Sequence, residues 1–131
     1  MMKLKKTKYN SKRTTVDGIS FHSKAEAKRY MELRLLEKAN KIYNLNLQPK
    51  FDCVVEGEKI CTYRADFEYW IRNGDFSPDD KYICEDVKGF RTQVYKIKKK
   101  LVEALHGIKI IEVKAWTAPS AVVLQWFRVG F

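Results

Sequence analysis

KYICEDVKGF, residues 81–90, decides how this sequence is interpreted, because it predicts a β-strand with charges at its centre. Apolar residues alternate along its first half, and Gly89 ends it. Successive strand residues point to opposite faces, so Asp86 and Lys88 share one face while Glu85 lies on the other. A buried charge without a partner is costly. The pattern therefore indicates either a solvated ion pair or a site that binds a charged ligand.

The segments before this strand predict a short hairpin and a helix. TTVDGISFH, residues 14–22, has a turn signal at Asp17-Gly18 between two short strands. Ser23 is a favourable N-cap, and Glu26 at the third helical position makes a capping box. The helix is expected to end near Asn40. Four apolar residues at helical spacing share one side of it: Ala27, Tyr30, Met31 and Leu35.

Extended structure is predicted between that helix and residue 81. Residues 44–55, NLNLQPKFDCVV, are extended, and Pro49 confines its position to a sheet edge or a bend. EGEK, residues 56–59, predicts a turn. ICTYRADFEYWI, residues 60–71, predicts one long strand because it is rich in aromatic and β-branched residues. A polar segment then turns the chain back.

After Gly89 the sequence predicts a second helix over residues 91–106 and then further strands. Residues 108–113 are a short apolar strand, and AVVLQWFRV, residues 121–129, predicts a last one. Two helices against a central mixed sheet, with a strand–helix–strand crossover, predict an α/β or α+β fold. Five residues form the apolar stripe of the second helix: Val94, Ile97, Leu101, Ala104 and Leu105.

Length and charge predict one domain with a polyanionic partner. The 131 residues are 45% hydrophobic, which suffices for one core over residues 14–131, preceded by a basic, flexible arm over residues 1–13. The formal net charge is +10, with six basic residues in positions 3–13 and six more in 88–100. Such a charge attracts polyanions, so nucleic acid is the expected partner. The alternative is a basic protein whose charge serves only solubility.

Composition also disfavours several classes of protein. No apolar run approaches the roughly 20 residues that span a bilayer, and the basic start lacks the apolar stretch of a secretion signal. Cys53, Cys61 and Cys84 are odd in number and lack metal-ligand spacing, so reduced thiols in a cytoplasmic protein are expected. His22 and His106 are isolated and are assigned no ligand role.

The acidic residues of the two long strands allow a metal site. A hairpin between these strands would set Asp66 opposite Asp86. Close carboxylates repel unless a cation lies between them, and their hard oxygens suit Mg²⁺. Such an ion lowers the pKa of an attacking water, while Lys88 offsets charge developing on a phosphate. The alternative is a surface ion pair between Asp86 and Lys88, with Asp66 paired to a neighbouring cation.

Five sequence blocks, in order, resemble the PD-(D/E)XK nuclease superfamily. The likeness is closest to a small phage-borne branch related to Holliday-junction resolvases. The blocks are VDGISFHSKAEAKRY, LQPKF, YRADFEY, CEDVKGF and TQVYKIKKKL, which together cover roughly residues 8–113. Two positions depart from the pattern in the family's name: Ala65 stands in place of the proline, and Asp86 stands where glutamate is more usual.

The resemblance implies a restriction-endonuclease-like core, in which helix, three strands, helix and strand surround a mixed β-sheet. It implies that Asp66, Asp86 and the backbone carbonyl of Val87 bind Mg²⁺, for which Mn²⁺ substitutes. Lys88 is implied as the catalytic lysine. Glu26 would complete the catalytic set as a metal ligand, directly or through water. The alternative for Glu26 is a capping role alone.

The implied activity is that of a Mg²⁺-dependent endodeoxyribonuclease, leaving 5′-phosphate and 3′-hydroxyl ends, with branched DNA such as a Holliday junction as the fitting substrate. The relatives imply a homodimer encoded by a phage or prophage and located in the bacterial cytoplasm, away from membranes. The basic arm and second helix, together with positions that the resemblance adds, give these expected DNA-binding residues: Lys5, Lys6, Lys8, Lys12, Arg13, Gln48, Arg91, Tyr95, Lys98 and Lys99.

A second function remains open, that of a non-catalytic DNA- or RNA-binding accessory protein on the same fold. The presence of two acids and the lysine favours the nuclease. Glu85 is expected to be outward-facing or structural rather than catalytic, and Tyr95 with Lys98 is alternatively a plain helix flank. The tryptophans are expected to make core or dimer contacts rather than base-stacking platforms: Trp70, Trp116 and Trp126.

Overall fold

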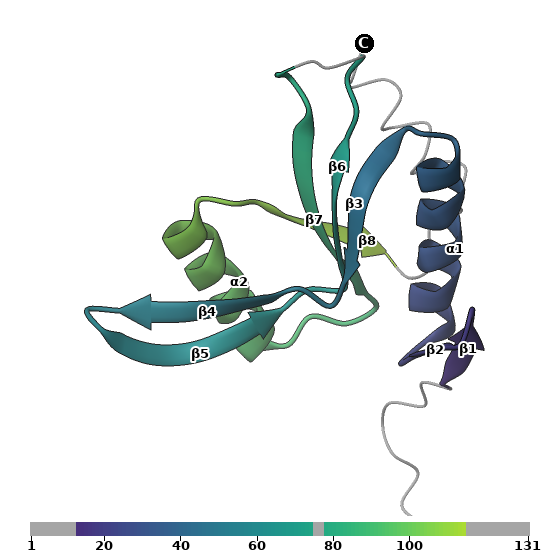
Figure 1. Ribbon diagram of the computed structural model, residues 1–131. Helices are drawn as coiled ribbons and strands as arrows, with labels where there is room; N and C mark the ends of the chain where they lie inside the picture. Colours follow the sequence, from purple (N-terminus) through teal and green to yellow (C-terminus); the bar gives the residue numbers. More distant parts are fainter. Residues whose placement is uncertain (1–12, 75–77, 115–131) are drawn as a thin grey trace, which may run out of the picture.

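The computed structural model describes residues 13–74 and 78–114 of the chain. The elements in these ranges are β1 (Thr14–Val16), β2 (Ile19–Phe21), α1 (Lys24–Lys38), β3 (Ile42–Leu47), β4 (Lys50–Val55), β5 (Glu58–Arg64), β6 (Phe67–Ile71), β7 (Lys81–Lys88), α2 (Gln93–His106) and β8 (Ile110–Lys114). Two helices flank a mixed sheet, so the fold is of the α/β class, as predicted (Figure 1).

The centre of the structure is a four-stranded sheet in the order β3-β6-β7-β8. Strand β6 runs antiparallel to both β3 and β7, whereas β8 runs parallel to β7. Helix α2 forms the crossover between these two parallel strands (Figure 1). Because β7 has a neighbour on each side, its residues Cys84, Glu85, Asp86 and Val87 are all buried. The charged strand of the sequence is therefore an interior strand.

Helix α1 packs against one face of this sheet and begins where the capping signal predicts. The Ser23 hydroxyl accepts the backbone N–H of Glu26 at 3.1 Å. The helix ends at Lys38, and Asn40 follows with a left-handed φ of 60°. Both ends agree with the sequence prediction, because short polar side chains cap helix starts and asparagine tolerates left-handed backbone.

The side of α1 that packs differs in part from the apolar side expected from sequence. Met31 and Leu35 are 46% and 67% exposed, whereas Leu33 is fully buried. The packed face includes a charged residue, Arg29, which displaces the face from the run of apolar positions. Residues of α1, the β1–β2 pair and the sheet form the first core: Phe21, Ala27, Tyr30, Leu33, Ile42, Phe67, Tyr69, Val87 and Val113.

Strands β4 and β5 form a hairpin that leaves the sheet and projects to one side (Figure 1). The prediction of one strand over residues 60–71 was wrong, because the chain bends at Ala65-Asp66 and passes from β5 into β6. The partner segment bends at Gln48-Pro49, between β3 and β4. Two backbone hydrogen bonds join the bends, from Gln48 N–H to the Asp66 carbonyl and from Ala65 N–H to the Pro49 carbonyl. We call this double bend the corner.

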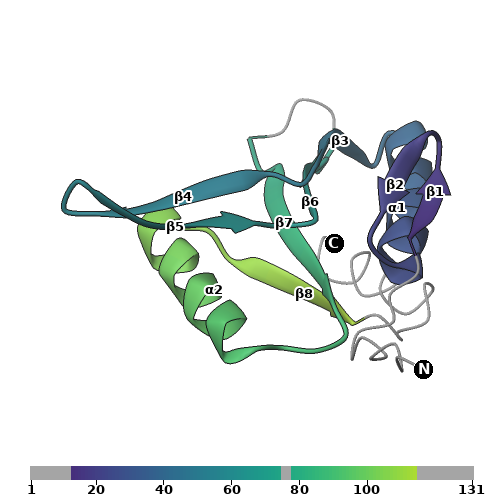
Figure 2. The same ribbon diagram turned by 90° about the horizontal axis from the view of Figure 1, so that it is seen from below.

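Helix α2 packs against the hairpin, on the side of the sheet opposite to α1 (Figure 2). The predicted apolar stripe of α2 is wrong as the packed face for most of its length, since Val94 and Ile97 are 62% and 66% exposed, while Leu101 of the stripe does pack against the second core. Val102 is fully buried instead, and Tyr95, seven residues earlier on the same face, lies beside it in the cluster. The buried residues of this second core are Cys53, Tyr63, Ala65, Cys84, Val102 and Ile110.

The predicted turns are present in the structure. Asp17 and Gly18 have φ angles of 52° and 75°, and Glu56 and Gly57 have 48° and 82°. Positive φ at both central residues suits the twist of a two-residue hairpin. The cysteines are free thiols, as expected. Within the described ranges, no helix is long and apolar enough to cross a membrane.

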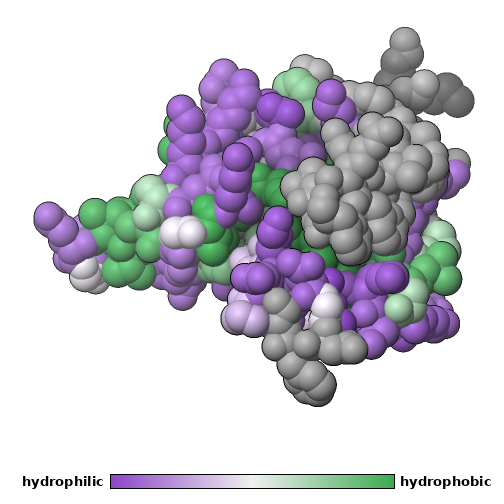
Figure 3. All heavy atoms as spheres, turned by 90° about the horizontal axis from the view of Figure 1, so that it is seen from above, coloured by the Kyte–Doolittle hydropathy of each residue, from purple (hydrophilic) through white to green (hydrophobic). Residues whose placement is uncertain are grey.

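The surface of the hairpin carries apolar side chains towards its tip. Val54, Val55 and Ile60 are 45%, 40% and 58% exposed. Figure 3 shows apolar atoms gathered at the projecting end of the molecule, while polar side chains dominate much of the remaining described surface of that view. The expected arm over residues 1–13, apart from Arg13, and the expected strand over residues 121–129 lie outside the described residues.

Candidate active site

Asp66 lies at the corner, immediately before β6. Because Phe67 pairs with Glu85, the antiparallel register places Asp66 opposite Asp86, as predicted. The backbone N–H of Asp66 donates to the Glu85 carbonyl at 3.1 Å, and its carboxylate accepts the N–H of Val87 at 2.7 Å. Burial, as the largest influence, raises the pKa of Asp66 to about 6.

Asp86 is 1% exposed in the middle of the sheet. Its Oδ2 accepts a hydrogen bond from the hydroxyl of Tyr63, which is itself buried in β5. Its Oδ1 is buried and has no hydrogen-bond partner among the described residues. Burial raises the pKa of Asp86 to about 6 against the opposing charge of Lys88. A buried carboxylate with one free oxygen is stabilised by a bound cation.

Lys88 ends β7 and stands half-buried beside these acids. Its Nζ lies 4.5 Å from the centre of the Tyr95 ring, within the range of a cation–π contact. Its charge lowers the pKa of Asp66 and of Asp86. No ion pair within salt-bridge distance joins Lys88 to a described carboxylate. The arrangement is therefore unlike a solvated surface pair of Asp86 and Lys88.

Glu26 is brought to the same site by the first turn of α1. Burial raises the pKa of its carboxyl group, a backbone hydrogen bond at His22 lowers it, and the charges of Lys88 and Asp86 act on it in opposite directions. The capping role is present too, because the Glu26 N–H is bound by Ser23. The structure thus shows the cap and also places Glu26 in the electrostatic surroundings of the two aspartates.

The donor set was tested for its fit to a divalent cation. Within residues 13–74 and 78–114, no three His, Cys, Asp or Glu side chains converge closely enough to hold a metal ion. Asp66 and Asp86 nevertheless supply hard carboxylate oxygens from adjacent strands, and one Asp86 oxygen is unpartnered in this part of the chain. Such oxygens suit Mg²⁺, which completes its shell with water. The two aspartates therefore fit an ion held by protein and water together.

Glu85 points away from this site and has a structural role. Its two carboxylate oxygens accept from Arg29 at 2.6 Å and 3.0 Å, and one of them also accepts from the Tyr69 hydroxyl at 2.9 Å. Glu85 and Arg29 are 0% and 3% exposed. Of the two alternatives from sequence, the outward-facing one is wrong and the structural one is correct. The buried pair joins α1 to the central strand.

The corner fixes the backbone at Ala65 and Gln48. Ala65 donates its backbone N–H to the Pro49 carbonyl at 3.1 Å. A proline at position 65 would lack that donor. Gln48 adopts a φ of 52°, and its side chain accepts from Arg64 at 3.5 Å. Gln48 thus lies beside Asp66, exposed at the rim of the site.

The expected DNA-binding residues fall into separate groups. Arg91 and Lys99 both pair with Glu112 of β8, at 2.5 Å and 3.0 Å. Tyr95 donates to the same carboxylate at 3.3 Å, whereas Lys98 lines a groove described below. Arg13 is exposed. The remaining four expected residues lie outside the described range: Lys5, Lys6, Lys8 and Lys12.

Sequence reasoning missed residues that surround the site. Tyr63 lies three positions before Asp66, and in one straight strand the two would face opposite sides. Only the corner turns them toward one strand, so no sequence pattern indicates the contact between Tyr63 and Asp86. Arg29 had a signal, since it follows Glu26 by three positions on the helix face that packs. Glu112 had none, because it is one acid in a short strand.

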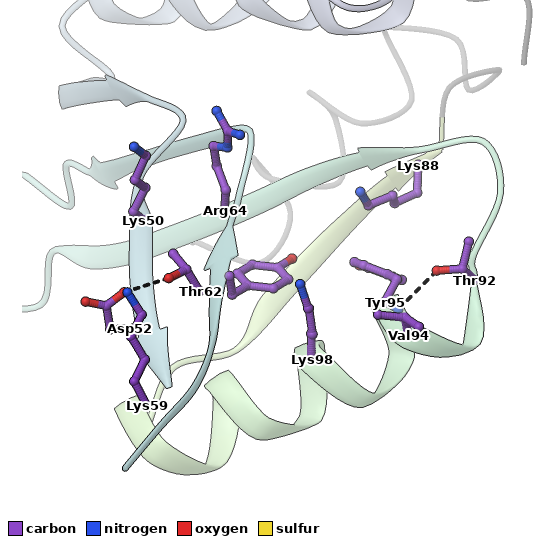
Figure 4. A pocket seen from close by; sticks show the side chains of 11 residues that line it. Lys50, Asp52, Lys59, Thr62, Arg64, Lys88, Thr92, Val94, Tyr95 and Lys98 are labelled. Atoms are coloured by element: carbon purple, nitrogen blue, oxygen red, sulfur yellow. Dashed lines mark hydrogen bonds and ion pairs between the residues drawn. The ribbon is translucent and has the colours of Figure 1, made fainter. Parts of the chain in front are cut away.

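A groove of about 800 Å³ opens beside Lys88, along the hairpin and past the first turns of α2 (Figure 4). Among the described residues that line it, Asp52 is the one acid, and it is bound by Thr62 at 2.8 Å and by Lys59 at 3.1 Å. Figure 4 shows Lys98 rising from α2 toward β5. The cations that line this groove are Lys50, Lys59, Arg64, Lys88 and Lys98.

Fold and site together define an α/β protein with two opposed aspartates, one buried and one half-buried, and a lysine at the edge of a basic groove. The chain belongs to the family described as protein of unknown function (DUF1064), whose model matches residues 6–120. That range contains every described helix and strand, with Glu26, Asp66, Asp86 and Lys88 among its residues. No curated protein and no solved structure matches the chain.

Proposed function

We propose that this protein is a Mg²⁺-dependent endodeoxyribonuclease. The observation that carries the proposal is the opposition of Asp66 and Asp86 across β6 and β7, with Lys88 two residues further on. Asp86 is buried and Asp66 is half-buried, and loss of contact with water raises both pKa values to about 6. Two adjacent acids that are shielded from water destabilise a fold at neutral pH. Their presence at one point favours a ligand-binding role over a structural one.

The residues of the site take separate roles in the proposed reaction. Asp66, Asp86 and the carbonyl of Val87 would hold the ion, and Mg²⁺ when bound supplies a Lewis acid that activates water and polarises a phosphodiester. Lys88 would orient the attacking water and offset negative charge on the phosphate. Glu26, whose pKa is raised by burial, would accept a proton from that water.

The order of elements supports a restriction-endonuclease-like core. Along the chain, α1, β3, β6, β7, α2 and β8 follow the order helix, three strands, helix, strand that the resemblance to PD-(D/E)XK nucleases implies. The sheet formed by these strands is mixed, as the resemblance also implies. The β4–β5 hairpin is then an addition between the first two strands of the core.

Branched DNA is the proposed substrate, because the resemblance favours it and a net charge of +10 suits binding phosphates rather than reading bases. A homodimer would bring two sites to a four-way junction and cut two strands. The rival function is nucleic-acid binding without catalysis. One observation favours this rival, namely that no three metal-ligating side chains converge within the described ranges.

The first prediction is that the purified protein cuts DNA with Mg²⁺ and not with EDTA, and that Asp86→Asn abolishes cutting. The amide keeps the shape of the carboxylate but removes the negative charge that holds the cation. Plasmid, linear duplex, single-stranded DNA and a synthetic four-way junction are incubated and resolved on gels, and binding of the junction is measured in parallel.

Glu68→Gln is the control variant for this assay. Glu68 lies on β6 near Asp66, but its carboxylate is bound by Tyr82 at 2.6 Å and by Asn46 at 3.2 Å, away from the corner. It is expected to cut as the unmodified protein does. Cutting retained by Asp86→Asn would contradict the assignment. Binding of DNA with no metal-dependent cut on any of the substrates would favour the rival function.

A further inference from the structure

The hairpin presents two unlike faces. On one face, Phe51, Cys53 and Tyr63 belong to the second core, beneath which α2 packs. On the other face, Lys50 and Arg64 are exposed and line the groove beside Lys88. Since alternate residues of a strand share a face, the sequence places these two cations together on the unpacked side.

Lys50 and Arg64 stand directly opposite each other as cross-strand partners at the base of the hairpin. Like charges in that position destabilise a strand pair. No salt bridge within the described ranges joins either cation to a carboxylate; Arg64 has only a 3.5 Å hydrogen bond to Gln48. The fold therefore keeps an unfavourable pair of positive charges facing the groove.

The position of the pair ties it to the site. Arg64 precedes Asp66 by two residues and Lys50 follows Gln48 by two, so both flank the corner. Lys88 and Lys98 line the same groove on its other side (Figure 4). Asp52, the one acid among the described lining residues, is already bound by Lys59 and Thr62. From this part of the chain, a negatively charged polymer that enters the groove therefore meets several cations and no free carboxylate.

We propose that this groove binds the phosphate backbone of the DNA strand adjacent to the cut site, with Lys50 and Arg64 as a pair of phosphate contacts. The inference rests on the proposed function, and it names residues of the hairpin as the substrate-holding arm of the enzyme. Along one strand of B-DNA, successive phosphates are about 3.4 Å apart, measured along the helix axis. A strand whose phosphate lies at Asp66 and Asp86 thus has its next phosphates within reach of the hairpin base.

The second prediction concerns the salt dependence of binding. Replacement of both cations, in Lys50→Gln/Arg64→Gln, removes two phosphate contacts. Each contact contributes about 0.9 to the slope of log affinity against log salt, so the slope should fall by about 2. Affinity for a fluorescein-labelled 20-base-pair duplex should drop roughly tenfold or more near 0.15 M salt. Binding is measured by anisotropy in EDTA from 0.05 to about 0.3 M NaCl, so that neither metal nor cutting is needed.

Lys41→Gln/Lys81→Gln is the matched control with the same change in net charge. Both lysines are exposed, and both lie at the end of the sheet farthest from Lys88, where Ile71 pairs with Lys81 and Ile42. The control is expected to keep the slope of the unmodified protein. Circular dichroism and thermal melting check that both double variants are folded.

Several outcomes would overturn the inference. Equal changes of slope in the two double variants would show that only net charge matters. An unchanged slope in the groove variant would show that DNA binds elsewhere. If the groove variant lost as much affinity for poly-L-glutamate as for DNA, the groove would be a general surface for acidic polymers. If the unmodified protein cuts no DNA but the groove variant alone loses slope, the nuclease proposal fails and the groove stands.

Discussion

Asp66 and Asp86 show how the fold acts on single side chains. Burial raises the pKa of each to about 6, against an ordinary value of 3.8. A group with a raised folded-state pKa contributes stability that is present below pH 3.8 and lost as the pH rises through about 6. At neutral pH both side chains are charged while largely shielded from water, so these two groups make the metal-free protein less stable than it is in mild acid.

The third prediction follows from this pH dependence. Asp86→Asn should raise the melting temperature of the metal-free protein at pH 8 by a few degrees, about what 1 kcal/mol gives for a domain of this size. The gain should shrink at pH 4, where the aspartate is protonated. Differential scanning fluorimetry in EDTA at both pH values measures the effect.

Asp52→Asn is the control. Asp52 is exposed and paired with a cation, so its contribution to stability changes with pH in the opposite direction to that of Asp86. Thr62 and Lys59 lower the pKa of Asp52. Its contribution is therefore present above pH 3.8 and lost in acid. This variant should be no more stable than the unmodified protein at pH 8. A pH-independent effect of Asp86→Asn would show that the aspartate does not titrate as its burial requires.

At the scale of single residues, strand alternation was a good guide to the site. It separated Asp86 and Lys88 from Glu85, and the structure places Glu85 with Arg29 on the α1 side. What alternation lacks is any information about partners on distant elements. The contacts from Tyr63 to Asp86 and from Arg29 to Glu85 join residues 23 and 56 positions apart. Long-range pairing of this kind follows from packing, not from local pattern.

At the scale of elements, the corner is what distinguishes this chain from a simple meander. The pair β3–β6 and the pair β4–β5 are one ribbon of two segments that bends at Gln48-Pro49 and Ala65-Asp66. Gln48 makes the bend with a φ of 52°. Non-glycine residues in this conformation are uncommon, and bulky β-branched ones are strongly disfavoured. The strain lies beside the proposed catalytic aspartate.

The fourth prediction tests that conformation. Gln48→Val should destabilise the protein by about 1–2 kcal/mol, because its branched side chain disfavours positive φ. Gln48→Gly should be neutral or stabilise it slightly, since glycine accepts the same φ at little cost. Urea denaturation measures both. Equal destabilisation by valine and glycine would point to the lost side chain, including its contact with Arg64, in place of backbone strain.

The elements show which local signals succeed. Capping residues and turn residues act through neighbouring backbone, and Ser23, Asp17-Gly18 and Gly89 marked their boundaries correctly. Residues 60–71 misled because every position favours a strand and the bend is imposed by a partner segment. Helix α2 misled because its longest apolar stripe, through Val94 and Ile97, is exposed. The packed face of α2 is determined by its contact with the hairpin, and the pattern of the helix sequence alone does not indicate that contact.

At the scale of the whole molecule, the central sheet separates two cores that are joined through β7. Val87 of β7 belongs to the first core, on the α1 side of the sheet. Cys84 of the same strand belongs to the second core, on the hairpin side. The Arg29–Glu85 pair crosses from α1 to the same strand. Loss of one member of a buried pair leaves an uncompensated charge in the interior.

The fifth prediction is that Arg29→Met destabilises the whole molecule by about 3–5 kcal/mol. Arg29→Met/Glu85→Leu should recover much of that loss, since apolar residues of similar size replace a buried pair at little cost. Chemical denaturation followed by tyrosine and tryptophan fluorescence and by circular dichroism gives the free energies. Additive losses in the double variant would show that the two side chains act independently. A loss confined to one probe would show that the cores unfold separately.

Sequence alone indicated the class of fold and the charged strand of the molecule, because both depend on periodicity and composition. It also indicated the opposition of Asp66 and Asp86, which needs only a hairpin register. It did not indicate the groove, since Lys50 and Arg64 are ordinary surface cations until the corner sets them in one groove with Lys88. The groove depends on the bends at Gln48-Pro49 and Ala65-Asp66 together, and neither segment has a sequence pattern that predicts it.

The hairpin has a consequence for how members of this family can diverge. Its tip at Glu56-Gly57 is exposed and lies at the end of the hairpin opposite to the corner. Insertions at such tips are tolerated because they disturb no packed backbone. Under the proposed function, natural selection can therefore lengthen, shorten or recharge the hairpin to suit different DNA shapes while the proposed catalytic residues at its base stay unchanged.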